Sequence, residues 1–171
     1  MKTKIRFILF TLLAFVAFTS CEENNYDSYP PTWWGFRFAP YPPVAGDSLK
    51  ITAVQSKKGH LINATSYTWT LTCNIVKENN LNVDTVLTFR QKTNYDGISN
   101  ADPTCGFLVP ENAEGYATVS FEALYAFSGA GIQGTSGNDY ERPEGIYGNI
   151  NSTSAAMTGS AKGTYRFRIV K

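Results

Sequence analysis

The sequence has few of the residues from which catalytic and metal centres are built. It contains one histidine, His60, and three cysteines among 171 residues. His60 lies in the turn-like stretch KKGHL without a nearby nucleophile, which argues against a Ser–His or Cys–His pair. His60, Cys73 and Cys105 cannot complete a tetrahedral zinc site, and the carboxylates are scattered, with no close acidic pair. We therefore predict no catalytic residues, no enzymatic activity and no bound metal.

A nucleotide-binding loop is also missing, although one glycine motif resembles it in spacing. The stretch GAGIQG at 129–134 matches G-x-G-x-x-G. A dinucleotide site needs a helix to begin at the third glycine. The residues that follow, TSGNDYERPEG, contain Gly137 and Pro143 and cannot continue as a helix. We therefore expect the protein to work without a cofactor.

The apolar run that begins the chain is too short to span a membrane as a helix. Phe7–Phe18 has twelve residues, whereas a transmembrane helix needs about 20. A basic segment with Lys2, Lys4 and Arg6 precedes the run, and small residues follow it. This arrangement is typical of a secretory signal peptide, here residues 1–20, which lies outside the folded domain.

Charge of either sign forms no long run, which limits the possible partners. Without residues 1–20 the chain keeps 12 of its 15 basic residues against 14 acidic ones, a net charge of −2. No basic stripe is available to neutralise phosphates. We therefore expect no nucleic-acid partner.

The residues around Cys21 indicate where the mature chain is held. Thr19 and Ser20 precede Cys21, and this arrangement resembles a bacterial lipobox. The resemblance implies that Cys21 is the first mature residue and carries fatty acyl chains such as palmitate, since two chains anchor a protein stably. Glu22 and Glu23 resemble the surface-export signal of Bacteroidota-type lipoproteins, with residues 21–31 as a polar tether. An outer-membrane lipoprotein at the cell surface is implied, with the periplasmic face as the alternative. An ordinary signal peptide with a chance cysteine is the competing interpretation.

The remaining two cysteines fit the same compartment. Cys73 and Cys105 would fold in an oxidising environment, where an even pair normally forms a disulfide. We predict that disulfide, with two buried free thiols as the alternative.

Apolar and polar residues alternate along most of the mature chain, which favours strands over helices. In SYTWTLTCNIV one face holds Tyr67, Trp69, Leu71 and Cys73, and threonines hold the other. The segments SLKITAV, VDTVLTFRQ, YATVSFEALYAF and GTYRFRIVK repeat this pattern, with turn-forming residues between them. We predict one all-β domain over residues 32–171, an antiparallel β-sandwich of about seven strands.

The densest aromatic segment is TWWGFRFAPY, residues 32–41. At a period of two residues, Trp34, Phe36 and Phe38 share one face, which predicts a first strand facing the core. Trp33 and Tyr41 are left over from that face, and we assign them as candidate ligand contacts.

Several of these segments together resemble a known superfamily. PYPPVAGDSLKITAV, then SYTWTL, then PENAEGYATVSFEA and the closing GTYRFRIVK are similar to PKD and immunoglobulin-like β-sandwich domains. In that superfamily a Gly–Asp turn precedes the second strand, and an inward tryptophan lies on the third. The resemblance covers most of residues 33–171 and implies an immunoglobulin-like or PKD-like sandwich.

A long insert rich in glycine, serine and asparagine occupies residues 128–162, before the predicted last strand. Loops of this length are usually functional or disordered. We predict a binding loop, with a flexible connection or a partly ordered hairpin as the alternative. Tyr140 and Tyr147 are its candidate ligand contacts.

Two short motifs carry a further expectation. Asp47–Leu49 and Asp84–Val86 resemble the acceptor used for protein O-glycosylation in Bacteroidota-type bacteria, with Ser48 and Thr85 as acceptors. The alternative is an ordinary turn residue and an ordinary strand residue.

Together these features predict a lipid-anchored surface lipoprotein with a non-catalytic binding or interaction role. Its partners would be the membrane, through Cys21, and a glycan or an envelope protein, since aromatic rings stack on the apolar faces of sugars. The alternative is a structural component of an envelope or fimbria-like assembly, for which an unpaired strand edge would be the useful feature.

Overall fold

The computed structural model describes residues 27–76, 82–94, 101–128, 131–132, 141–155 and 157–171. The regular secondary structure in these ranges consists of β-strands, with no helix. The all-β fold predicted from the alternating pattern is confirmed. The strands are β1 (Asp27–Ser28), β2 (Thr32–Ala39), β3 (Ser48–Lys57), β4 (Ile62–Val76), β5 (Asn82–Asn94), β6 (Thr104–Leu108), β7 (Ala113–Phe127), β8 (Gly131–Ile132), β9 (Asn149–Ala155) and β10 (Thr158–Arg168).

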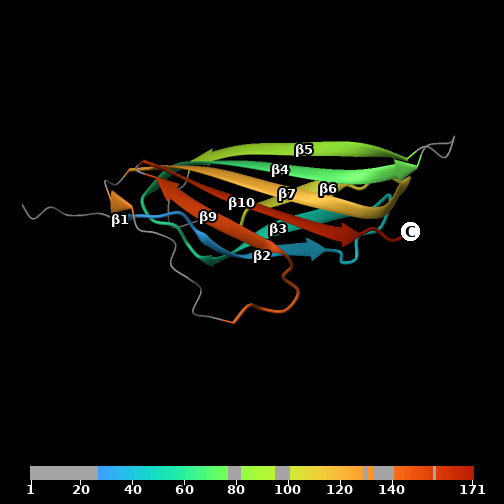
Figure 1. Ribbon diagram of the computed structural model, residues 1–171, viewed down its shortest axis with the longest axis horizontal. Coiled ribbons are helices and arrows are strands. Elements are labelled where there is room, and N and C mark those ends of the chain that lie inside the picture. The colour runs from blue at the N-terminus through green and yellow to red at the C-terminus, as the bar shows by residue number, and fades with distance from the viewer. Residues whose placement is uncertain (1–26, 77–81, 95–100, 129–130, 133–140, 156) are drawn as a thin grey trace, which may run out of the picture.

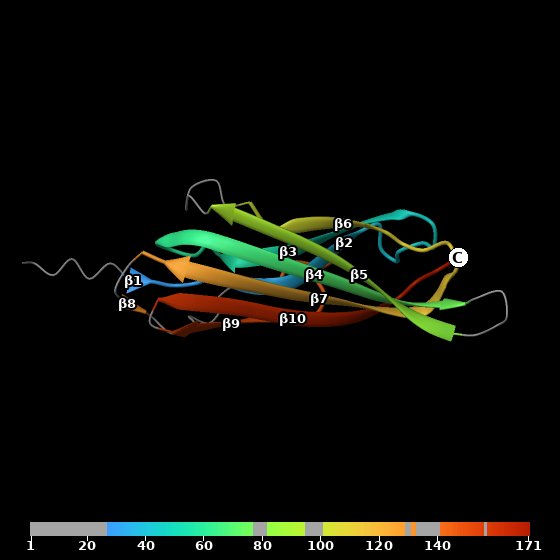
Figure 2. The same cartoon turned by 90° about the horizontal axis from the view of Figure 1, so that it is seen from above.

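Eight of the strands form two antiparallel sheets that stack on each other (Figures 1 and 2). The larger sheet has five strands in the order β5-β4-β7-β10-β9, and the smaller has three in the order β2-β3-β6. β1 and β8 form a separate two-residue parallel pair. The arrangement is a β-sandwich, as predicted.

The two longest strands show why the alternating pattern produces this fold. Along β4, the side chains of Trp69, Leu71 and Cys73 are fully buried, while the threonines between them are only partly covered. β7 pairs with β4 and presents Val119 and Phe121 to the same core. Each strand therefore buries one face against the opposite sheet, which stabilises the sandwich.

Aromatic side chains from both sheets interlock in the core. Phe36 on β2 contacts Trp69 and Phe121 of the larger sheet, with ring centroids 6.3 and 6.5 Å apart. Phe38 packs on Phe167 of β10 at 4.9 Å. These tilted and edge-to-face arrangements are the favoured geometries for aromatic pairs.

One prediction for β2 is wrong: Trp33, expected on the outward face, points into the core. It is only 6% exposed, and its ring lies edge-on to Phe121 at 5.3 Å. The cause is an irregularity in the β2–β3 register between Thr32 and Gly35, which shifts the two-residue period. Trp33 is therefore not available as a ligand contact.

Part of the insert predicted over residues 128–162 belongs to the sheet and is not a loop. β9 and the first residues of β10 lie within this range and form an antiparallel hairpin. β10 also pairs with β7 along its whole length. The strand was difficult to recognise because serine, threonine and asparagine fill most of β9, and only Ile150 is buried.

Gly35 is the position where the irregular backbone of β2 excludes other residues. Its φ is +133°, and an added Cβ would lie 2.5 Å from the carbonyl oxygen of Tyr147. We predict that Gly35→Ala lowers the free energy of unfolding by about 1–3 kcal/mol, measured by urea denaturation. The matched control is Gly106→Ala, where an added Cβ meets nothing within 4 Å. Equal stability of the two variants would contradict the prediction.

Candidate functional site

Three tyrosines from distant parts of the chain form one partly exposed stack, which we call the tyrosine cluster. Tyr41 follows β2, Tyr147 precedes β9 and Tyr165 lies on β10. The rings of Tyr41 and Tyr147 stack with centroids 4.3 Å apart, and those of Tyr147 and Tyr165 at 5.6 Å. Tyr41 is 42% exposed. The two tyrosines that the sequence indicated as ligand contacts, Tyr41 and Tyr147, are thus neighbours in space.

The core and one backbone bridge hold the cluster in place. The Phe36 N–H donates to the Tyr147 carbonyl at 2.8 Å, and the Tyr147 N–H donates back to Phe36 at 2.8 Å. Phe38 lies beneath the cluster, with its ring centroid 5.7 Å from those of Tyr41 and Tyr165. The tyrosines therefore stand on a rigid aromatic base.

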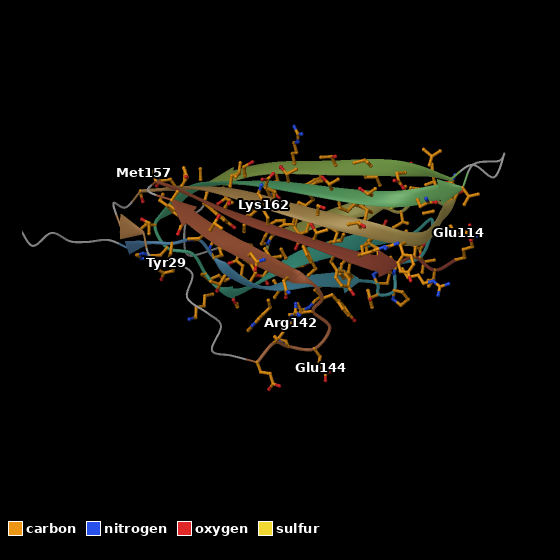
Figure 3. All side chains as sticks on the ribbon, in the orientation of Figure 1. Tyr29, Glu114, Arg142, Glu144, Met157 and Lys162 are labelled. Atoms are coloured by element: carbon orange, nitrogen blue, oxygen red, sulfur yellow. The ribbon has the colours of Figure 1, made fainter. Side chains whose placement is uncertain are left out.

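Arg142 ties the loop before β9 to the same region. Its guanidinium donates to the carbonyl oxygens of Trp34 and Gly148. In Figure 3 the Arg142 side chain lies on this loop beside the sandwich. This contact fixes the backbone that carries Tyr147 against β2.

The hydroxyl groups of the cluster add hydrogen-bonding capacity to the stacked rings. The hydroxyl oxygens of Tyr41 and Tyr165 are 3.4 Å apart. Burial, and then the hydrogen bond with Tyr41, raise the pKa of Tyr165 to about 12. A neutral tyrosine hydroxyl both donates and accepts hydrogen bonds. The cluster therefore combines apolar rings with polar groups at one surface.

A second concave surface, the outer groove, lies on the solvent face of the larger sheet. Its volume is about 590 Å³, and Tyr116 and Arg166 belong to its lining. The Arg166 guanidinium carbon is 4.3 Å from the centroid of the Tyr116 ring, and Tyr116 is 56% exposed. The other lining residues are Thr72, Asn74, Val76, Asp84, Glu114, Gly115 and Thr118.

Sequence reasoning did not single out Tyr116 as a possible contact. The signal was present in the alternation of β7, where the outward Tyr116 and Thr118 alternate with the buried Ala117 and Val119. The exposed Tyr116 ring and the guanidinium of Arg166, which pairs with Thr118 on the neighbouring strand, together mark the surface.

The structure describes both predicted glycosylation residues but not all of the other predicted site residues. Ser48 is exposed at the start of β3, whereas Thr85 is partly buried on β5, directly opposite Cys73. O-glycosylation stays a prediction at both, and Ser48 is the more accessible acceptor. Tyr140 lies outside the described residues, as do Cys21, the signal peptide over 1–20 and most of the tether.

The two cysteines of the domain are free thiols in the structure, so the expected disulfide is not present there. Cys73 on β4 pairs with Ala117 on β7, which in turn pairs with Phe167 on β10. Cys105 on β6 pairs with Ile51 on β3 in the smaller sheet. Both are buried among apolar side chains, and each fills its place in the core as a small apolar residue.

Other expected absences can be described only for part of the chain. Within the described ranges, no three His, Cys, Asp or Glu side chains gather in a way that could hold a metal ion. His60 stacks on Tyr29, with ring centroids 5.6 Å apart. The same ranges include no helix with the length and apolar character needed to cross a membrane.

Comparison with protein-family models, with curated proteins and with solved structures finds no match to this chain.

Because both thiols are buried, we expect the free energy of unfolding to depend on pH in the alkaline range. Burial raises the pKa of Cys73 to about 11 and that of Cys105 to about 12, from an ordinary value of 9.0. Above pH 9 the unfolded chain loses these protons first, so the free energy of unfolding should fall as pH rises. The expected slope is about 1.4 kcal/mol per pH unit for each thiol.

This prediction is checked by urea denaturation between pH 8 and pH 11, because the range begins below the ordinary thiol pKa of 9.0 and reaches the raised pKa of Cys73, about 11. The control is the double variant Cys73→Ala, Cys105→Ala, which removes both thiols and keeps every other ionisable side chain. A wild-type slope no steeper than that of the control would contradict the prediction, and is also the result that a disulfide would produce.

Proposed function

We propose that the chain is a non-catalytic binding module, held by lipid at the bacterial outer-membrane surface, and that the tyrosine cluster contacts a glycan. The observation that carries the proposal is the convergence of Tyr41, Tyr147 and Tyr165 into one stack with an exposed outer ring. Segments distant in the sequence supply these rings, and two of the three were expected to contact ligand.

The chemistry of the cluster suits a sugar. Sugar rings have apolar C–H faces, which stack on aromatic rings, and hydroxyl groups, which bond to neutral donors and acceptors. The cluster offers the partly exposed ring of Tyr41 and hydroxyl groups at Tyr41 and Tyr165. Phe38 holds the cluster against the core, so its side chains would lose less conformational entropy when a ligand binds.

The competing role is that of a structural part in an envelope or fimbria-like assembly. One observation supports it: within the described ranges, the outer edge of β6 in the smaller sheet pairs with no strand. A bare strand edge can accept a strand from another protein.

Binding to a glycan array, followed by titration with the best glycan, tests the proposal. We predict that Tyr41→Ala weakens glycan binding at least about tenfold, equivalent to about 1.4 kcal/mol, because the partly exposed aromatic ring is lost. Tyr41→Phe keeps the ring and should lose less affinity. Tyr29→Ala, another exposed tyrosine outside the cluster, is the matched control. Folded protein that binds no glycan would favour the assembly role instead.

The membrane anchor is tested separately. We predict that the protein recovered from the membrane fraction begins at Cys21 and carries a mass increment corresponding to fatty acyl chains, measured by intact-mass spectrometry. Cys21→Ala should remain unprocessed and lack the increment, whereas Cys73→Ala should be lipidated normally. An unmodified Cys21 thiol in mature protein would contradict the anchor.

A further inference from the structure

The sandwich is closed along one side and open along the other. On the closed side, β2 approaches β9: the Trp33 Nε1–H donates to Ser152 Oγ at 3.0 Å, and Phe36 forms its backbone bridge to Tyr147. On the open side, β6 ends the three-stranded sheet and, among the described residues, pairs only with β3. The five-stranded sheet ends there in β5 (Figure 2).

The free edge of β6 presents backbone groups in the spacing of a strand. The Pro103 carbonyl accepts from Ala53 N–H at 2.9 Å, and Val109 N–H donates to Asp47 at 3.0 Å. The odd-numbered residues of this segment therefore direct their backbone groups to β3. In an antiparallel ladder the alternate residues direct theirs the other way, so the N–H and C=O groups of Thr104, Gly106 and Leu108 face the open side.

A groove of about 580 Å³ runs along this edge, and apolar side chains stand at its borders. Phe89 of β5 lines it and is 37% exposed, and Leu108 of β6 is 67% exposed. Gly106 also lines the groove, with open space where a Cβ would be. Along β5, Leu87 packs only partly against the core. An added strand would cover apolar surface as well as satisfy the backbone groups.

A second copy of this chain does not fit the edge through its own β6. The larger sheet has two more strands than the smaller, and its β5 reaches the groove beside β6. Direct β6–β6 pairing would bring the β5 strands of both copies into the same space. The edge is also only five residues long. Pairing along five residues would bury much less than the roughly 800 Å² per partner that stable interfaces bury. The occupant must therefore be a single extended segment.

The charge at the groove indicates what that segment carries. Lys50 is the only charged residue of the groove lining in the described part of the chain. It lies directly opposite Gly106 on the adjacent strand. Since glycine has no side chain, an acidic side chain on an added strand can reach across Gly106 to the ammonium group.

We propose that the free edge of β6 binds an extended segment of a partner protein as a fourth strand of the smaller sheet. The segment has alternating apolar residues, which cover Leu87 and Phe89, and an acidic residue that faces outward opposite Gly106. This interaction is independent of glycan binding by the tyrosine cluster.

The probe is the peptide Thr-Val-Glu-Val-Thr, blocked at both ends and titrated into the purified protein while amide resonances are followed by NMR. Binding should protect the amides of Thr104, Gly106 and Leu108 from hydrogen exchange. The same peptide N-methylated at its glutamate should bind at least about tenfold more weakly, because its backbone can no longer pair with Gly106.

Two protein variants separate the backbone contact from the charge. Gly106→Pro removes an N–H that faces the open side and is compatible with an edge strand, so the fold should persist while peptide binding falls at least about tenfold. Lys50→Glu should weaken binding of this peptide up to about fivefold and favour the peptide with lysine in place of glutamate. The Lys50 variant keeps the proposal testable if Gly106→Pro fails to fold.

Several results would overturn the proposal: equal binding to folded Gly106→Pro, equal binding of the N-methylated peptide, or no saturable binding up to about 1 mM. Unchanged peptide preference in Lys50→Glu would overturn the acidic specificity. Glycan titration of the same variants should be unaffected, so failure here is distinguishable from failure of the glycan proposal.

Discussion

The interlock of Phe36 and Phe38 with the rings of the opposite sheet is the contact on which the rest of the structure depends. These two side chains join β2 to β4, β7 and β10 at once. They determine which residues of β2 face inward and which strand lies beside β9. The tyrosine cluster rests on Phe38, so the proposed glycan contact is an extension of the core. Without this packing, the three tyrosines would have no common support.

The same packing gives the two sides of the sandwich different properties. On the side of β2 and β9, side chains and backbone groups of both sheets meet, and the strand edges are covered. On the side of β5 and β6, the unequal number of strands leaves a step with exposed backbone groups. Isolated edges of this kind are a hazard for aggregation. The overhang of β5 reduces that hazard, because it prevents two identical edges from meeting.

Much of the fold could be predicted from local pattern, and the failures have identifiable causes. The alternation in β4, β7 and the end of β10 reports burial of one sheet face, so it translates directly into structure. It failed in β2, where the irregularity near Gly35 changes the phase. It also missed β9, whose residues have little apolar character. The meeting of Tyr41 with Tyr147 depends on long-range backbone pairing, which local sequence does not encode.

The length of the strands has a consequence for how far the domain reaches. β4 and β7 each contain 15 residues, and a strand of that length extends about 50 Å. β1 lies at one end of this long axis, while the C-terminus lies at the opposite end (Figure 1). Glu114, which lines the outer groove, lies near the C-terminal end (Figure 3). A chain anchored through residues before β1 would therefore hold that end well beyond the lipid headgroups, which occupy only about 5–8 Å on each side of a bilayer.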